Sequence, residues 1–367
     1  MRAAYPLVGA VALLLLAGMA MAPSPTAKKL IEFGWDEPDP RFMREHIREM
    51  QASPFDGCVF HADYRTAAGD SGSFTWKMWG QRRFTARDLA AAGADLRATN
   101  FGRFRENFLR VNVTPGDLDW FKDHSAVMAN LELAARLAKQ SGGPGILFDI
   151  EPYQGKLWDF AVQARVHPHT PARTWAVLAV QVRRRGAEAM RALERGYPGL
   201  TVFLSLGYSW PLEASRGDVR ALDRTDCGLL APFLDGMISV ASERVVLVDG
   251  HELSYSYREP ARFAAKADSM RHGALRMTAQ PGRYSQRLSV GFGVWLDNDW
   301  RKWGWNTEDP AKNYFTPAAF AVSVQAAFDH ADRYVWIYSE TPRWWTASGG
   351  PRALPAAYDS VLRHIRR

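Results

Sequence analysis

The residue pair with the clearest chemical potential is Asp149 and Glu151, which close an apolar run over residues 145–151. Side chains on a β-strand alternate between its two faces, so acids two positions apart point the same way. Pro152 follows directly and predicts the end of the strand, because proline cannot donate to the sheet ladder. Two carboxyl groups at the end of a buried strand are costly as structure and typical of a catalytic site.

The chemistry that fits this pair is acid/base cleavage of a glycosidic bond. One carboxyl group must stay protonated to donate to the leaving oxygen, and another must be ionised as nucleophile or base. Like charges on one strand face repel, so we predict Glu151 as the general acid and Asp149 as the group that tunes it. Such neighbours bracket a substrate poorly, since their Cβ atoms lie only roughly 6–7 Å apart. The opposing catalytic carboxylate should come from elsewhere in the fold, with Glu340 as first choice, followed by Glu252, Asp249 and Asp297.

Aromatic and polar side chains gather where other strands are expected to end. The chain has 14 tryptophans, and many fall at such ends or in two long connections. Indole and phenol rings stack on the apolar faces of sugars, while their polar edges bind hydroxyl groups. We therefore predict a cleft with carbohydrate as the partner. Its expected substrate-binding residues are Trp35, Asp36, His61, Tyr153, Asp249, Glu252, Tyr255, Trp295, Asp297, Trp336 and Tyr338.

Strand-like and helix-like segments alternate along the chain and must position these residues. Strands are expected at residues 30–35, 55–61, 108–113, 145–151, 200–206, 235–241, 288–294 and 334–339. Helical patterns follow at residues 41–51, 85–97, 117–140, 171–195, 219–230, 259–271, 316–329 and 355–365.

Eight alternating strand–helix units predict an α/β fold, a closed (β/α)8 TIM barrel with its active site at the carboxyl ends of the strands. We expect one domain over residues 28–367. A doubly wound open sheet is the alternative. It usually carries a glycine-rich phosphate turn after the first strand, where this chain has Trp35-Asp36-Glu37-Pro38.

Residues 1–22 have the organisation of a secretory signal peptide. Arg2 supplies the positive region, residues 7–19 the apolar region, and Ala20-Met21-Ala22 a small-x-small cleavage site. The apolar run is too short for a comfortable membrane span. We therefore expect an exported protein, secreted or periplasmic, without a stable membrane anchor.

Charge and cysteine content argue against other classes of protein. The formal net charge is +7, but the basic residues are scattered, so no nucleic-acid partner is expected. Cys58 and Cys227 are the only cysteines, which excludes a disulfide scaffold. The His167-Pro168-His169 sequence has no third ligand nearby, and no His-Glu-x-x-His occurs. We expect no metal and no cofactor, with a divalent cation among the acidic strand ends as a weaker alternative.

The strand-four motif resembles two groups of barrel glycoside hydrolases. Asp149-Ile150-Glu151 with Tyr153 is similar to the Asp-x-Glu end of the family 18 chitinase motif, whose glutamate is the acid and whose aspartate supports substrate-assisted attack. Glu151-Pro152 resembles the Asn-Glu-Pro of the large retaining clan, but position 150 is isoleucine. Residues 142–145 also replace the upstream aspartates of the chitinase motif, and Asp297 stands near where the clan has a glutamate. The resemblance implies a glycoside hydrolase-like barrel and no particular family.

Three functions compete on this sequence. The favoured one is an exported glycoside hydrolase acting on a polysaccharide or glycoconjugate. The second is a non-catalytic carbohydrate-binding barrel that keeps the cleft. The third is a substrate-assisted hydrolase of N-acetylated sugars, which needs no distant nucleophile. A metal-dependent hydrolase or lyase is a further alternative, which a chelator would inactivate.

Overall fold

The computed structural model describes residues 27–166, 173–346, 349–350 and 352–367. The predicted signal peptide at residues 1–22 and the His167–His169 pair lie outside these residues. Among the described helices, none combines the length and the hydropathy of a membrane-spanning segment. Cys58 and Cys227 are buried free thiols.

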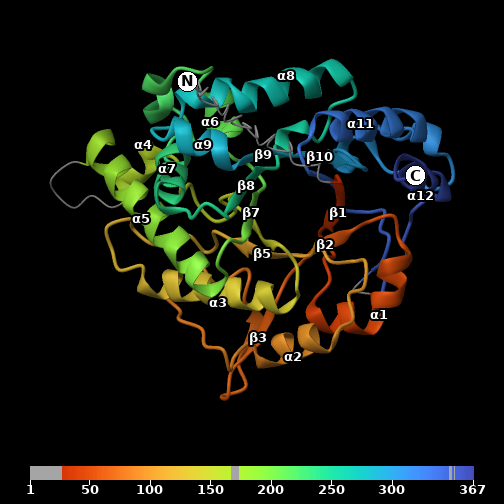
Figure 1. The fold of residues 1–367 in the computed structure, drawn as a ribbon, viewed down its shortest axis with the longest axis horizontal. Coiled ribbons are helices and arrows are strands. Elements are labelled where there is room, and N and C mark those ends of the chain that lie inside the picture. The colour runs from red at the N-terminus through yellow and green to blue at the C-terminus, as the bar shows by residue number, and fades with distance from the viewer. Residues whose placement is uncertain (1–26, 167–172, 347–348, 351) are drawn as a thin grey trace, which may run out of the picture.

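Parallel strands form the centre of the molecule, and helices surround them (Figure 1). In sheet order the strands are β10 (Phe292–Trp295), β11 (Tyr334–Ser339), β1 (Lys29–Gly34), β2 (Gly57–Phe60), β5 (Phe108–Asn112), β6 (Gly145–Asp149), β7 (Thr201–Leu204), β8 (Val246–Asp249) and β9 (Leu288–Val290). Only Gly291 separates β9 from β10, so the two ends of the sheet meet in one stretch of chain. The strands therefore form a TIM barrel with eight strand positions, which confirms the predicted fold class.

Helices cover the outside of the barrel between successive strands. They are α1 (Pro40–Ala52), α2 (Ala90–Ala98), α3 (Ser125–Gln140), α4 (Phe160–Val166), α5 (Trp175–Gly196), α6 (Ser209–Ala214), α7 (Leu230–Val240), α8 (Pro260–Arg271), α9 (Pro281–Arg287), α10 (Trp300–Trp303), α11 (Pro317–His330) and α12 (Ala356–Ile365). Short 3₁₀ turns are η1 (Val219–Arg224), η2 (Glu252–Ser254), η3 (Gly273–Arg276) and η4 (Pro310–Lys312). Asp39 and Thr316 cap α1 and α11, and proline follows each cap at the first helical position.

The sixth predicted strand is wrong. Residues 235–241 fall largely in α7, and the sixth barrel strand is β8, which begins at Val246. α7 is buried on nearly every side, so its sequence lacks the polar stripe of a surface helix and resembles a buried strand. It crosses α5 closely: a Cβ at Gly236 would lie 1.9 Å from the backbone oxygen of Arg183. This close packing requires glycine at the crossing.

Alternation along each strand separates two apolar layers. Inside the barrel a compact cluster includes Ile31, Phe108 and Leu147, whereas Ile146 and Phe148 face the surrounding helices. Residues two positions apart on a strand share a face. The side chain that follows an interior residue by two positions therefore lies at the carboxyl end of the barrel. This geometry sends polar side chains from β5 and β6 into the mouth of the barrel.

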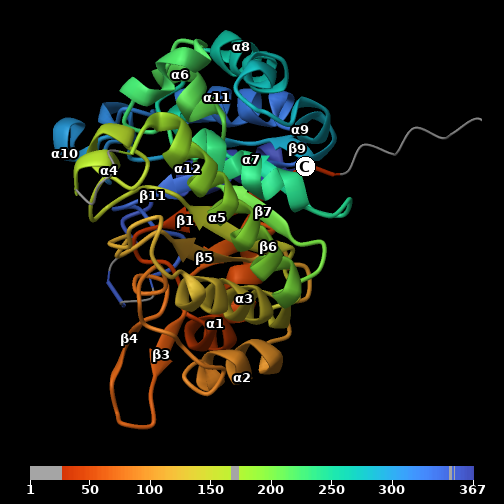
Figure 2. The ribbon, with the colours of Figure 1, turned by 90° about the vertical axis from the view of Figure 1, so that its left-hand side faces the viewer.

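The long connection after β2 contains an antiparallel hairpin of β3 (Asp63–Arg65) and β4 (Ser71–Ser73). The hairpin extends away from the barrel at the foot of Figure 2. The same connection then brings Trp76 against Trp35, with ring planes 5° apart and centroids 6.4 Å apart. Aromatic stacking therefore ties this loop to the end of β1.

Candidate active site

A cavity of about 210 Å³ opens at the carboxyl ends of the barrel strands. We call it the carboxylate cavity. The predicted residues that line this cavity are Trp35, Asp149, Glu151, Tyr153, Glu252, Tyr255, Trp295, Tyr338 and Glu340. Four residues that were not predicted also line it: Phe33, Gly34, Arg110 and Ser205. Residues more than 300 positions apart thus meet in one place, because the barrel brings every strand end to the same face.

Asp149 is the last residue of β6 and only 2% exposed. Its carboxylate accepts hydrogen bonds from Asn112 Nδ2 at 3.0 Å and the Tyr153 hydroxyl at 3.1 Å, and the Glu151 backbone N–H donates at 3.2 Å. Arg110 Nη1 lies 3.6 Å away. Burial raises the pKa of Asp149, while Arg110 and these donors oppose the rise. The contacts identify Asp149 as a carboxylate held in a fixed orientation.

Glu151 lies two residues beyond Asp149 and is partly exposed to the cavity. Burial and then the negative charge of Asp149 raise the pKa of Glu151. The chain segment that carries Glu151 is anchored on both sides of Ile150: Trp158 Nε1 donates to the Ile150 carbonyl at 2.7 Å, and the Ile150 N–H donates to Ser205 Oγ at 3.4 Å. Glu151 therefore combines access to the cavity with a raised pKa.

Glu252 begins η2, directly after β8. Burial raises its pKa well above the ordinary range, and the charges of Glu151 and Asp149 raise it further. Its backbone N–H donates to the Ser205 carbonyl at 3.0 Å, which joins η2 to the end of β7. Three carboxyl groups thus influence one another on this side of the cavity. Their mutual repulsion favours retention of a proton within the group.

Glu340 follows β11, which lies four strand positions from β6 in either direction around the barrel. It is therefore the carboxylate on the opposite wall. Its side chain is 10% exposed and lies 3.3 Å from Arg301 Nη2; it also accepts hydrogen bonds from Trp300 Nε1 and, at 3.4 Å, from the Tyr338 hydroxyl. These contacts fix the orientation of the Glu340 carboxylate.

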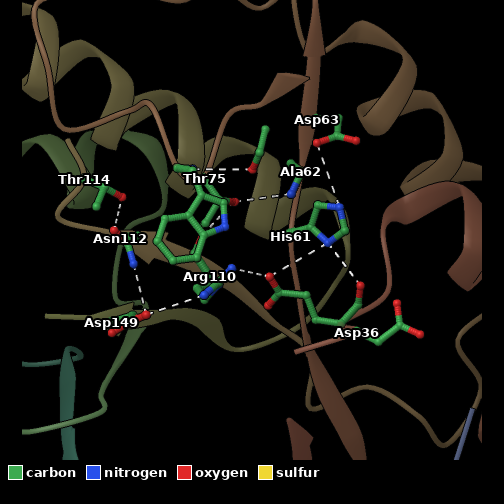
Figure 3. A network of polar contacts seen from close by, with 12 residues as sticks. Asp36, His61, Ala62, Asp63, Thr75, Arg110, Asn112, Thr114 and Asp149 are labelled. Atoms are coloured by element: carbon green, nitrogen blue, oxygen red, sulfur yellow. Dashed lines mark hydrogen bonds and ion pairs between the residues drawn. The ribbon is translucent and has the colours of Figure 1, made fainter. Parts of the chain in front are cut away.

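Arg110 is the charged residue of the carboxylate cavity that the sequence reasoning missed. It lies in β5 with a side chain only 7% exposed, and Nη2 is 2.5 Å from Glu37 Oε1. Its guanidinium also lies 4.7 Å from the centre of the Trp76 ring. Figure 3 shows Arg110 between Asp149 and His61. An arginine inside an apolar strand run was the available signal, since a buried charge needs a partner.

A second and larger cavity, of about 500 Å³, adjoins the first and shares Trp35 and Arg110 with it. We call it the platform cavity. The predicted residues Asp36 and His61 line this cavity and not the carboxylate cavity. His61 Nδ1 lies 3.1 Å from the Glu37 carbonyl oxygen, and Nε2 lies 3.9 Å from the Asp63 carboxylate.

Three other predicted residues do not line the carboxylate cavity and have structural contacts instead. Asp249 accepts hydrogen bonds from Ser209 Oγ at 2.8 Å and from neighbouring backbone N–H groups. Asp297 accepts from the Glu340 N–H at 3.0 Å and from Trp295 Nε1 at 2.8 Å. Trp336 is fully buried in the barrel interior. Within the described residues, no group of three or more His, Cys, Asp or Glu side chains is arranged to hold a metal ion.

Comparisons with known proteins find resemblance only among solved structures. No family model and no curated protein matches the chain. A glucosidase from Croceicoccus marinus is 13% identical, with a TM-score of 0.47 over 93% of this chain and 68% of its own. A protein from Anabaena variabilis described as a sugar phosphate isomerase/epimerase is 13% identical, with a TM-score of 0.46 over 93% and 97%. A GH5_18 protein from Streptomyces cattleya, in complex with GlcNAc, is 14% identical, with a TM-score of 0.45 over 94% and 81%. The fold itself is established by the strand pairing described above.

Proposed function

We propose that the protein is a glycoside hydrolase in which Glu151 donates the proton to the leaving oxygen. The observation that carries this proposal is the contrast between two acids on one strand end. Asp149 is oriented by Arg110, Asn112 and Tyr153, whereas Glu151 faces the cavity, and burial followed by the charge of Asp149 raises the pKa of Glu151. An acid poised in its neutral form beside an open cavity suits general acid catalysis.

The opposing carboxylate in this proposal is Glu340. Both acids line the carboxylate cavity, Glu340 follows the strand across the barrel from β6, and an indole, a phenol and a guanidinium hold its carboxylate in place. Glu252 lies on the side of Glu151, where burial and like charges favour its neutral form. We assign Glu252 to binding a sugar hydroxyl and Glu340 to the role of nucleophile or base.

Substitution of Glu151 by glutamine tests the proposal. On glycosides with poor leaving groups, Glu151→Gln should lower kcat/KM by about 10²- to 10⁴-fold, since general acid catalysis contributes about that much. The loss should be much smaller on aryl glycosides with good leaving groups, because their departure needs little protonation. Initial rates over a panel of oligosaccharides and matched aryl glycosides supply the measurement.

Two further variants complete the experiment. Glu243→Gln alters an exposed glutamate in the turn before β8 and should leave all rates unchanged. Glu340→Gln should abolish turnover on both substrate types. Retention of activity in Glu340→Gln, together with loss in Asp149→Asn, would instead indicate a substrate-assisted mechanism. Equal activity of Glu151→Gln and the wild type on poor leaving groups would refute Glu151 as the acid.

A further inference from the structure

The platform cavity and the carboxylate cavity adjoin each other. Trp35 and Arg110 line both, so these two side chains form the boundary where the cavities meet. The platform cavity has a volume of about 500 Å³ and the carboxylate cavity one of about 210 Å³. These sizes suit one sugar unit in the smaller cavity and further units in the larger one. This arrangement suits a chain of sugars more than a single one.

An aromatic platform leads from one cavity to the other. Trp35 is 53% exposed and stacks nearly parallel to Trp76, and Tyr153 stands against Trp76 with ring centroids 5.0 Å apart. An exposed indole held by a second ring offers a flat apolar face of fixed orientation. Such a face binds the apolar side of a sugar ring at small entropic cost.

Along both cavities acidic side chains outnumber arginines, whereas the whole chain is basic. The chain carries a formal net charge of +7. Four acids and one arginine, Arg110, line the carboxylate cavity. The platform cavity shares Arg110 and adds four acids and one further arginine. The acids are Asp149, Glu151, Glu252 and Glu340, and then Asp36, Glu37, Asp39 and Glu45.

Several of these acids have arginine partners, including Glu340, which lies 3.3 Å from Arg301 Nη2. Glu45 is compensated by Arg41 and Arg44, but Arg110 is shared between Glu37 and Asp149. One oxygen of Glu37, Oε2, is buried and has no hydrogen-bond partner among the described residues. A ligand with positive charge would relieve the repulsion along this surface, whereas an anionic glycan would increase it.

We propose that the substrate is a chain of amino sugars with free ammonium groups, bound across both cavities with one unit stacked on the Trp35–Trp76 platform. This inference rests on the proposed function, because it places the bond to be cleaved beside Glu151. The aromatic platform supplies affinity that grows with chain length. The acidic surface selects the charged form of the sugar over its N-acetylated or acidic relatives.

Calorimetric titration of Glu151→Gln, which under the proposal cleaves its ligand at least about 10²-fold more slowly than the wild type, tests this inference. The probes are glucosamine oligomers from the monosaccharide to the hexamer, their fully N-acetylated counterparts, and oligogalacturonates. Near neutral pH we expect affinity to rise with length, and the amino oligomers to bind roughly tenfold or more tightly than the acetylated ones. That preference should shrink as salt is added, because salt screens charge.

Matched tryptophan variants in the same background locate the binding surface. Trp35→Ala should weaken hexamer binding by about three- to tenfold, as expected for one lost stacking contact, and should weaken monosaccharide binding less. Trp303→Ala removes an indole that is 55% exposed and lines neither cavity, so it should have no effect. Circular dichroism on each variant verifies that the fold is intact.

Two results would overturn the inference. Acetylated oligomers that bind as tightly as the amino oligomers would remove the selection by charge. Affinity that does not depend on chain length, or on Trp35, would remove the extended platform. Hydrolysis is measured separately on the wild type, so cleavage of neutral glycans with no preference for amino oligomers refutes only this inference. Selective binding of amino oligomers without any cleavage supports the inference and refutes the catalytic proposal.

Discussion

Asp149 and Glu151 are separated by one residue and occupy different electrostatic environments. Asp149 is buried among an amide, a phenol and a guanidinium, all of which donate to it or carry positive charge. Burial is the largest cause that raises the pKa of Glu151, the negative charge of Asp149 comes next, and a hydrogen bond with Tyr153 opposes them. Two acids separated by one residue at a strand end can therefore take different roles, because the contacts of each side chain influence its pKa.

A pH profile tests this division of roles. Asp149→Asn removes the charge that raises the pKa of Glu151, so the pKa of Glu151 should fall. A general acid is active while protonated, and its pKa sets the alkaline limb of the kcat/KM profile. We therefore expect that limb to move to lower pH in Asp149→Asn. An alkaline limb that stays in place would mean that another group donates the proton.

At the scale of elements, short turns after the strands hold the site together. Asp249 ends β8 and accepts from the N–H groups of Gly207, Ser209 and His251 at 3.1, 2.9 and 3.2 Å. A Cβ at Gly207 would lie 2.5 Å from the Asp249 carboxylate, so the turn after β7 needs glycine there. This junction positions η2 and therefore Glu252.

Asp249→Ala tests whether this carboxylate is structural. Its loss leaves several buried donors without an acceptor, and we expect the free energy of unfolding to fall by about 3 kcal/mol. Urea denaturation followed by tryptophan fluorescence gives that value. Gly207→Ala should weaken the same junction. Lost turnover with an unchanged free energy of unfolding would instead assign Asp249 to direct contact with substrate.

At the scale of the whole molecule, closure of the barrel and contact between distant elements stabilise the site. β9 and β10 join the two ends of the sheet on either side of Gly291. At the other end of the barrel, Arg366, just after α12, binds both oxygens of Asp56 at 2.8 and 2.7 Å and the Lys28 carbonyl at 2.8 Å. The last helix is thus tied to the segment that enters β1.

Adjacent C-terminal arginines offer a matched test of that contact. The Asp56 side chain is 9% exposed, so Arg366→Ala leaves a nearly buried carboxylate with weaker compensation. We expect a loss of about 2 kcal/mol in the free energy of unfolding. Arg367→Ala changes an exposed neighbour and should have no measurable effect. Equal stability of both variants in urea would show that α12 docks without this ion pair.

Some helices and strands could be predicted from the sequence because the pattern of apolar and polar residues within the segment specifies them. The eighth strand matches β11 at both ends, since a short apolar run bounded by polar residues suits a strand buried on two faces. The same rule failed over residues 235–241, because a helix buried on all sides has the same apolar pattern. Distinguishing the two requires knowledge of what packs around the segment, and α5 supplies that packing.

The sequence by itself determined that acids and aromatic residues would collect at strand ends, since strand alternation and strand termination are local properties. Only the tertiary structure decided which of them meet. Arg110, Asp149, Glu151 and Glu252 come from β5, β6 and the turn after β8, and closure of the barrel places Glu340 opposite them. The pKa of each acid depends on burial and on charges contributed by distant segments, so it is a property of the folded molecule.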